Sequence, residues 1–345
     1  MKIILSRTDS IGDVVLSLPM AGVLRQQFPG CHIVFLGRKY TRPIIEACRF
    51  VNEFLDWDEI SATRDPSSVL SGQASAIRHL QSLQADMIVH VFPVKAICRA
   101  AKQAGIPIRI ATSNRFYTWF YCNRLLRVPR KNSGLHEAQL NLKLLKPLGI
   151  TKAFSTEEIP EFYGLTAPSP TLPQTGEGEN APLPDKFNLI LHPKSKGSAR
   201  EWGLENFSRL IGLLPPEKFN LFVSGTAEEG NMMRDFLNMH QERVQDLTGK
   251  LSLSEFIQFI CSCDGIVAAS TGPLHIAAAF GKHAIGLYAP MRPIFPQRWA
   301  PLGKNARFLV LDKNCQACRK TENCECIRQI RAEDVAEILF SLRPC

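Results

Sequence analysis

The strongest constraint on the fold is an alternation of short apolar runs with helical segments. In the first half of the chain, apolar runs predict strands at residues 2–6, 32–36, 87–91 and 108–111. A helix is expected from Val14 to about Pro29–Gly30, so the chain opens with a strand–helix–strand unit. Such a unit requires parallel strands and a right-handed crossover. A helix over 136–148, stopped by Gly149, closes this half.

The same alternation returns after a stretch of different composition. Residues 165–185 read LTAPSPTLPQTGEGENAPLPD, which is typical of a linker. Beyond it, strands are predicted at 188–192, 220–224, 265–269 and 284–288, and helices at 204–214, 253–261 and 273–280. We therefore predict an α/β protein with two doubly wound, Rossmann-like domains at 1–165 and 186–345, a linker at 166–185, and a central cleft. This prediction leaves open whether the last helix packs back on the first domain.

Composition narrows the class of protein. A chain of 345 residues with 45% hydrophobic and 21% charged residues is globular rather than disordered or collagen-like. Its apolar runs are shorter than the roughly 18 residues of a spanning helix, and its first apolar patch is too short for a signal peptide. A cytoplasmic protein with reduced cysteines is therefore expected. The net charge of +9 favours an anionic partner.

The clearest candidate site is the turn from Ser270 through Thr271 and Gly272 to Pro273, followed by His275. It follows an apolar strand and opens a helix, whose unpaired N–H groups and dipole attract anions. A capped helix without a ligand is the alternative, and the position at a strand's carboxyl end favours a phosphate. A second loop, at 192–202, carries Lys194, Lys196 and Arg200 among small residues, and it could neutralise a pyrophosphate. Its alternative is a solvated basic loop.

Carboxylates follow two other strands. Asp13 could act as a general base, although an aspartate near a helix start is commonly only a cap, and the helix end is expected to lower its pKa. Glu228 or Glu229 could accept hydrogen bonds from ribose hydroxyls, but an exposed acidic first turn explains them as well.

Two further segments have open interpretations. Residues 109–131 interleave aromatic side chains with basic ones, among them Arg115 and Arg124, which suits nucleic acid, an anionic membrane, or a helix with a core-facing aromatic stripe. Cys315, Cys318, Cys324 and Cys326 could hold a structural zinc. Their uneven spacing favours a reduced loop or a facultative disulfide instead.

Taken together, the motifs resemble glycosyltransferase family 9, the ADP-heptose:lipopolysaccharide heptosyltransferases. The resemblance rests on the following segments: RTDSIGDVVLSLPMAGVLRQQFP, HEAQLNLKLLKPLGI, LHPKSKGSAREWGLENFSRLI, VSGTAEE, LTGKLSLSEFIQFICSCDGIVAASTGPLHIAAAFGKHAIGLYAP and the cysteine-bearing tail. It implies a GT-B fold, with the nucleotide-sugar in the second domain and the acceptor in the first. It also implies inverting transfer without a metal or cofactor, ADP-heptose being the donor.

The resemblance gives the candidate residues roles. It implies that Asp13 is the catalytic base and that Arg200 lies near the leaving pyrophosphate. It also implies that the following residues bind the donor: Lys196, Glu228, Ser270, Thr271, Gly272 and His275. Arg115 and Arg124 are expected to meet an anionic lipopolysaccharide acceptor at the inner face of the inner membrane.

Two departures from the family pattern leave alternatives open. The family often has Asp where this chain has Ser270, and usually Lys where it has Arg200. Another nucleotide-sugar, a non-lipopolysaccharide acceptor, or nucleotide-sugar binding without transfer are therefore alternative functions. Nucleic-acid binding is the least favoured, because the chain carries no recognisable nucleic-acid motif.

Overall fold

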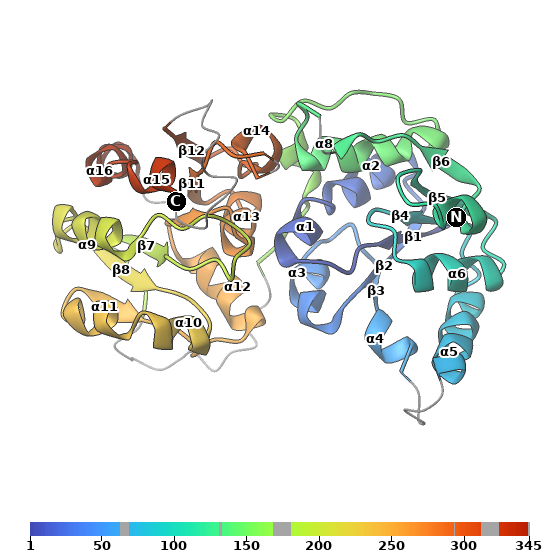
Figure 1. Ribbon diagram of the computed structural model, residues 1–345, viewed down its shortest axis with the longest axis horizontal. Coiled ribbons are helices and arrows are strands. Elements are labelled where there is room, and N and C mark those ends of the chain that lie inside the picture. Colours follow the sequence, from blue (N-terminus) through green and yellow to red (C-terminus); the bar gives the residue numbers. More distant parts are fainter. Residues whose placement is uncertain (63–68, 131–132, 168–180, 293, 312–323, 344–345) are drawn as a thin grey trace. The chain divides into compact units, whose positions relative to one another are not determined.

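Two compact units, Met1–Thr166 and Ala167–Cys345, make up the computed structural model (Figure 1). The structure describes residues 1–62, 69–130, 133–167, 181–292, 294–311 and 324–343. Each unit contains a six-stranded parallel sheet, in the orders β3-β2-β1-β4-β5-β6 and β12-β11-β10-β7-β8-β9. In both units the chain builds outward from a central strand, first to one side and then to the other. Both are therefore doubly wound, as the sequence predicts.

The N-terminal sheet is buried on both faces. Its strands are β1 (Lys2–Ser6), β2 (His32–Gly37), β3 (Glu53–Asp56), β4 (Met87–His90), β5 (Ile108–Thr112) and β6 (Arg124–Leu126). Ile4, Val34 and Ile88 pack against α5 (Val69–Ser82) and α6 (Lys95–Gln103). Since successive strand residues point to opposite faces, their neighbours face α2 (Pro19–Gln27) and α8 (Glu137–Leu142), which Figure 1 shows on the other side.

The C-terminal unit repeats this arrangement. Its strands are β7 (Phe187–His192), β8 (Phe219–Val223), β9 (Val244–Asp246), β10 (Gly265–Ala269), β11 (His283–Tyr288) and β12 (Ala306–Val310). Leu189 and Leu221 share a core with α9 (Leu204–Leu213) and α16 (Ala332–Phe340). Phe222, next along β8, meets Phe259 of α12 (Leu253–Ser262) at 4.8 Å between ring centroids. The final helix α16 thus packs on α9 of its own unit.

The predicted continuous helix after β1 was wrong. The structure has a short helix α1 (Ile11–Val15), a turn, and then α2, with Pro19 as the first residue of α2. Proline lacks a backbone N–H, so a helix cannot continue through it without losing a hydrogen bond. The helix predicted over 136–148 is α-helical only over Glu137–Leu142 and continues as a 3-10 segment over Lys143–Leu148, which Gly149 ends with a left-handed φ of 84°. The other predicted helices and strands are present.

The remaining helices are short connectors or lie between strands. They are α3 (Arg42–Glu46), α4 (Trp57–Ile60), α7 (Thr118–Tyr121), α10 (Ala227–Met232), α11 (Arg234–Met239), α13 (Gly272–Ala279), α14 (Pro296–Trp299) and α15 (Glu325–Arg328). In the part of the chain that the structure describes, no helix combines the length and apolar character needed to span a bilayer. Of the predicted linker 166–185, residues 168–180 lie outside the described residues.

One close contact sets how α2 is packed. A Cβ on Gly22 would lie 2.4 Å from the carbonyl oxygen of Phe162. Gly22→Ala should therefore destabilise the protein by about 1–3 kcal/mol, as overpacking does. Gly212→Ala, in helix α9 with open space around it, is the matched control and should stabilise by roughly 0.5–1 kcal/mol. Urea denaturation measures both, and equal stability of the two variants would contradict the packing argument.

Candidate functional site

A buried guanidinium organises the carboxyl end of β1. Arg7 is 2% exposed and makes a bidentate pair with Asp9, at 2.7 and 3.0 Å from its two oxygens. The same guanidinium donates to Asp13, and it lies 3.6 Å from the carboxylate of Glu137. Burial opposes the charge on Arg7, but the three carboxylates outweigh it and raise the pKa of the guanidinium. Arg7 is therefore charged at every relevant pH.

Asp13 is the partly open member of this network. Its side chain is 19% exposed and accepts hydrogen bonds from Arg7 and Ser10. Burial raises the pKa of Asp13 above its ordinary value, with Arg7 opposing and Asp9 adding to the increase. The expectation of a lowered pKa was wrong, because burial is the largest influence on this carboxyl. Among the described residues no backbone N–H donates to Asp13, so it does not act as a cap.

The far side of the network comes from α8 and the loop before it. Glu137 is 2% exposed and accepts from Arg130, which also donates to Asn141 at 3.0 and 3.1 Å. Asn141 in turn donates to the carbonyl of Leu16 at 3.0 Å. Sequence reasoning missed these partners, which stand more than a hundred residues from Arg7. Glu137 and Asn141 lie in the HEAQLNLKLL segment, which was predicted only as a helix, and Arg130 lies in the basic-aromatic segment.

The basic-aromatic segment is exposed rather than core-facing. Phe116, Trp119 and Phe120 are 73%, 66% and 66% exposed, so the interpretation as a buried aromatic stripe was wrong for these three. Arg115 is exposed and lies 4.9 Å from the ring of Phe92, and Arg124 is exposed at the start of β6. Of the other basic residues, Arg130 joins the buried network, and Lys131 lies outside the described residues.

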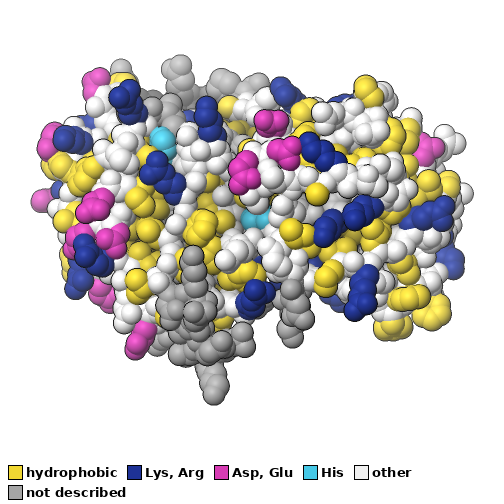
Figure 2. Space-filling model, turned by 90° about the horizontal axis from the view of Figure 1, so that it is seen from above, with side chains coloured by type: hydrophobic (Ala, Val, Ile, Leu, Met, Phe, Trp, Pro, Cys, Tyr) yellow, Lys and Arg dark blue, Asp and Glu magenta, His cyan; other side chains and the backbone are white. Residues whose placement is uncertain are grey.

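Charge is divided unequally between the two units. Residues 1–166 carry 21 Lys and Arg against 13 Asp and Glu, whereas residues 167–345 carry 20 against 19. Between Asp86 and Glu137 the sequence has nine basic residues and no acidic one. In the right half of Figure 2, which shows the N-terminal unit, basic side chains are spread over the surface with hydrophobic side chains between them. The excess positive charge thus lies almost entirely in the N-terminal unit, which suits that unit to a large anionic partner.

In the C-terminal unit, the turn after β10 has the features of an anion site. α13 begins at Gly272, with Pro273 as its second residue. Thr271 stands at the N-cap but makes no cap hydrogen bond, and its hydroxyl, in a residue 5% exposed, has no partner among the described residues. Ser270 instead interacts with buried Tyr288, and His275 is buried one turn into the helix. A buried hydroxyl without a partner is costly and favours a ligand.

The loop after β7 is ordered by an internal ion pair. Lys194 donates to Glu201 at 3.0 Å, and Glu201 also accepts from the backbone N–H of Ser195 at 3.1 Å. Lys196 is exposed, with a left-handed φ of 48°. Arg200 is half-buried, and its Nε has no hydrogen-bond partner among the described residues. Of the three predicted cations, Lys194 is thus occupied, while Lys196 and Arg200 remain available to a phosphate.

The two candidate ribose carboxylates have different environments. Glu229 is buried and closes a capping box, accepting from the backbone N–H of Thr226 at 2.8 Å and its hydroxyl at 3.0 Å. Glu228 is exposed on the first turn of α10. His192, the first residue of the predicted loop 192–202, was given no role from the sequence, and its Nδ1 lies 2.9 Å from the hydroxyl of Ser224. Burial lowers the pKa of His192, so this imidazole is neutral.

These three loops begin at the carboxyl ends of adjacent strands. The sheet order places β10, β7 and β8 side by side, so the loops beginning at 193, 224 and 270 lie at one edge. The order of the strands reverses its direction between the neighbouring strands β7 and β10. Doubly wound sheets bind ligands beyond the carboxyl ends of the strands at such a reversal. The zinc hypothesis for the cysteine-bearing tail stays a prediction, because Cys315 and Cys318 lie outside the described residues; Cys324 is buried in the core of the unit, and Cys326 packs against that core.

Comparison with known proteins agrees with this architecture. A family model described as glycosyltransferase family 9 (heptosyltransferase) matches residues 100–327. Lipopolysaccharide heptosyltransferase 2 of Escherichia coli is 24% identical over 340 residues, which cover 94% of this chain and 92% of that protein.

Solved structures give the same fold. The Escherichia coli ADP-heptose lipopolysaccharide heptosyltransferase II superposes with a TM-score of 0.73 at 19% identity, covering 99% and 98% of the two chains. A glycosyl transferase of family 9 from Veillonella parvula has a TM-score of 0.77 at 18% identity, covering 99% and 96%. At this identity the likeness shows the fold, and it confirms the predicted GT-B class.

The buried network makes a quantitative prediction. Glu137→Gln removes a buried carboxylate from between Arg7 and Arg130 and should cost about 3 kcal/mol of stability, because buried cations lose their counter-charge. Glu46→Gln is the control: its partner Arg42, at 3.6 Å, is exposed, so the change should cost less than roughly 0.5 kcal/mol. Urea denaturation compares the two, and similar small losses would show that the network contributes little.

Proposed function

Because this chain belongs to glycosyltransferase family 9, it is a glycosyltransferase, and we propose that it moves a heptose from ADP-heptose to a lipopolysaccharide inner-core acceptor. The observation that carries the donor half is the turn after β10, where the buried Thr271 hydroxyl is unpartnered at the start of α13. A diphosphate would supply the acceptor atoms for this hydroxyl, the helix N–H groups and Arg200. One solved relative is itself named for ADP-heptose.

In the proposed reaction, an acceptor hydroxyl attacks the anomeric carbon and the bond to the ADP oxygen breaks, with inversion. Asp13 takes the hydroxyl proton, and its raised pKa makes it a stronger base than an ordinary aspartate. Arg200, Lys196 and the N-terminus of α13 stabilise the negative charge that develops on the diphosphate. Glu228 accepts hydrogen bonds from the ribose hydroxyls. No metal or cofactor takes part in this proposal, since these residues supply the positive charge.

The basic N-terminal unit is proposed to receive the acceptor. Inner-core lipopolysaccharide carries phosphates and carboxylates, and Arg115 and Arg124 are exposed cations on that unit. The exposed aromatic side chains of Phe116, Trp119 and Phe120 suit the surface of the inner membrane on its cytoplasmic side, where the acceptor would be embedded. Because this chain has Ser270 where the family often has Asp, another nucleotide-sugar is the second candidate donor.

The proposal is tested by separating proton transfer from donor binding. Asp13→Asn should lower kcat by roughly 10²–10⁴-fold, the range for general-base catalysis, with little change in ADP affinity measured by calorimetry. Arg200→Gln should instead weaken ADP binding. Asp9→Asn is the matched control, because Asp9 also pairs with Arg7, and it should lower kcat far less. Loss of ADP binding in Asp13→Asn would make Asp13 a structural residue. Product mass spectrometry with several nucleotide-sugars identifies the donor.

The pH dependence of kcat gives a second test. Activity requires ionised Asp13, so kcat should fall as the pH drops through the pKa of this group. Since burial raises that pKa above the ordinary value of 3.8, the acid limb should lie above pH 3.8. The residual activity of Asp13→Asn should lack this limb. An unchanged limb in that variant would assign the titration to another group.

Membrane contact is tested with vesicles. Trp119→Ala should lower binding to phosphatidylglycerol vesicles by about tenfold, the effect of removing one large apolar side chain from a buried environment. Met239→Ala, which removes a 73% exposed side chain from α11 in the other unit, should leave binding unchanged. Vesicle co-sedimentation measures both variants. Equal binding to neutral phosphatidylcholine, or no loss in Trp119→Ala, would contradict a role for this surface.

A further inference from the structure

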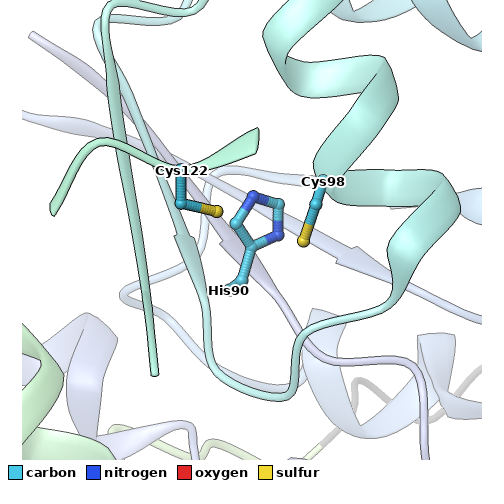
Figure 3. Close-up of side chains that lie close together, drawn as sticks. All are labelled: His90, Cys98 and Cys122. Carbon is cyan, nitrogen blue, oxygen red and sulfur yellow. The ribbon is translucent and has the colours of Figure 1, made fainter. Parts of the chain in front are cut away.

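Three side chains with metal-binding atoms meet inside the N-terminal unit. His90 ends β4, Cys98 lies on α6, and Cys122 follows α7 (Figure 3). One ligand atom from each lies within 4.8 Å of the other two. The residues are 0%, 0% and 7% exposed, so the cluster is closed to bulk water. It takes no part in the transfer reaction proposed above.

The imidazole of His90 is the group that needs a partner. Neither ring nitrogen has a hydrogen-bond partner of ordinary geometry among the described residues, although the side chain is fully buried and the Cys122 thiol interacts with the ring. Leaving a buried polar group unsatisfied costs roughly 1–3 kcal/mol, so native structures rarely do so. The two thiols lie beside this ring, as Figure 3 shows.

A disulfide between the thiols is the simplest alternative, and it fails to account for the histidine. Joining Cys98 to Cys122 would leave both imidazole nitrogens without a partner. A metal ion would engage all three side chains at once.

The donor atoms select the class of ion. Two sulfurs and one imidazole nitrogen suit zinc or copper(I), and they exclude calcium and magnesium, which prefer oxygen. Charge then favours zinc: two thiolates and one Zn²⁺ sum to zero, which suits a fully buried site, whereas copper(I) would leave a net negative charge.

We propose that His90, Cys98 and Cys122 form a zinc site with three protein ligands and a fourth position open to water or a backbone oxygen. Binding forms one Zn–N and two Zn–S bonds and releases the two thiol protons to solvent. The ion would join β4 and α6 to the segment after α7. Because that segment follows the exposed side chains of Phe116, Trp119 and Phe120, zinc would hold this surface in place.

The experiment measures zinc per chain in full-length protein prepared with zinc under reducing conditions. A background with Cys315→Ser, Cys318→Ser, Cys324→Ser and Cys326→Ser removes any contribution from the cysteine-bearing tail. In it, mass spectrometry should find one zinc per chain, lost in Cys98→Ser and Cys122→Ser. Cys31→Ser and Cys48→Ser are matched controls, because they remove other buried cysteines of the same unit, and they should retain the metal. Cobalt substituted for zinc should show thiolate-to-metal absorption.

Two readouts keep the proposal testable if a serine variant does not fold. His90→Gln should weaken zinc binding while the fold persists. In the tail background alone, a chelator should speed hydrogen exchange in peptides spanning 113–127. The proposal is overturned if no zinc is bound, if His90→Gln binds it equally well, if the chelator changes nothing, or if Cys98 and Cys122 are found as a disulfide in the zinc-treated protein.

Discussion

The N-terminal half of the site depends on the ion pairs that the buried guanidinium of Arg7 makes. A fully buried cation is costly unless its counter-charges are fixed, and here they come from α1 and α8 as well as from the loop after β1. Arg7 therefore holds Asp13 in place and opposes the burial that raises the pKa of that carboxyl. Replacing any member of the network changes the electrostatics of that carboxylate as well as stability.

The duplicated sheet order explains why the candidate residues gather where they do. In both sheets the winding reverses beside the first strand, between β1 and β4 and between β7 and β10. Loops that leave these strands diverge and open a crevice at the sheet's carboxyl edge. Asp13 follows β1, Arg200 follows β7, and Thr271 follows β10. In each unit, the candidate residues therefore follow the strands beside which the winding of that sheet reverses. The helices between the strands support the loops that carry them.

Sequence reasoning found the centre of each sheet and missed its edges. The predicted strands are β1, β2, β4 and β5, and β7, β8, β10 and β11, whose apolar runs reflect burial on both faces. The outermost strands, β3, β6, β9 and β12, are partly exposed and lack that signal. The same limit applies to the sites. Asp13 and Thr271 lie in the segments that follow β1 and β10, where the sequence order reveals them, whereas the partners of Arg7 and the cluster of His90, Cys98 and Cys122 are assembled only by tertiary folding.

The distribution of charge separates two modes of anion recognition. Eight of the nine net positive charges belong to residues 1–166, yet the diphosphate is proposed to bind in the nearly neutral second unit. A compact dianion needs only a few directed donors, which a helix start and one guanidinium provide locally. The large anionic acceptor proposed for this protein would be attracted instead by a field spread over many side chains. The absence of any acidic residue between Asp86 and Glu137 is what such a field requires.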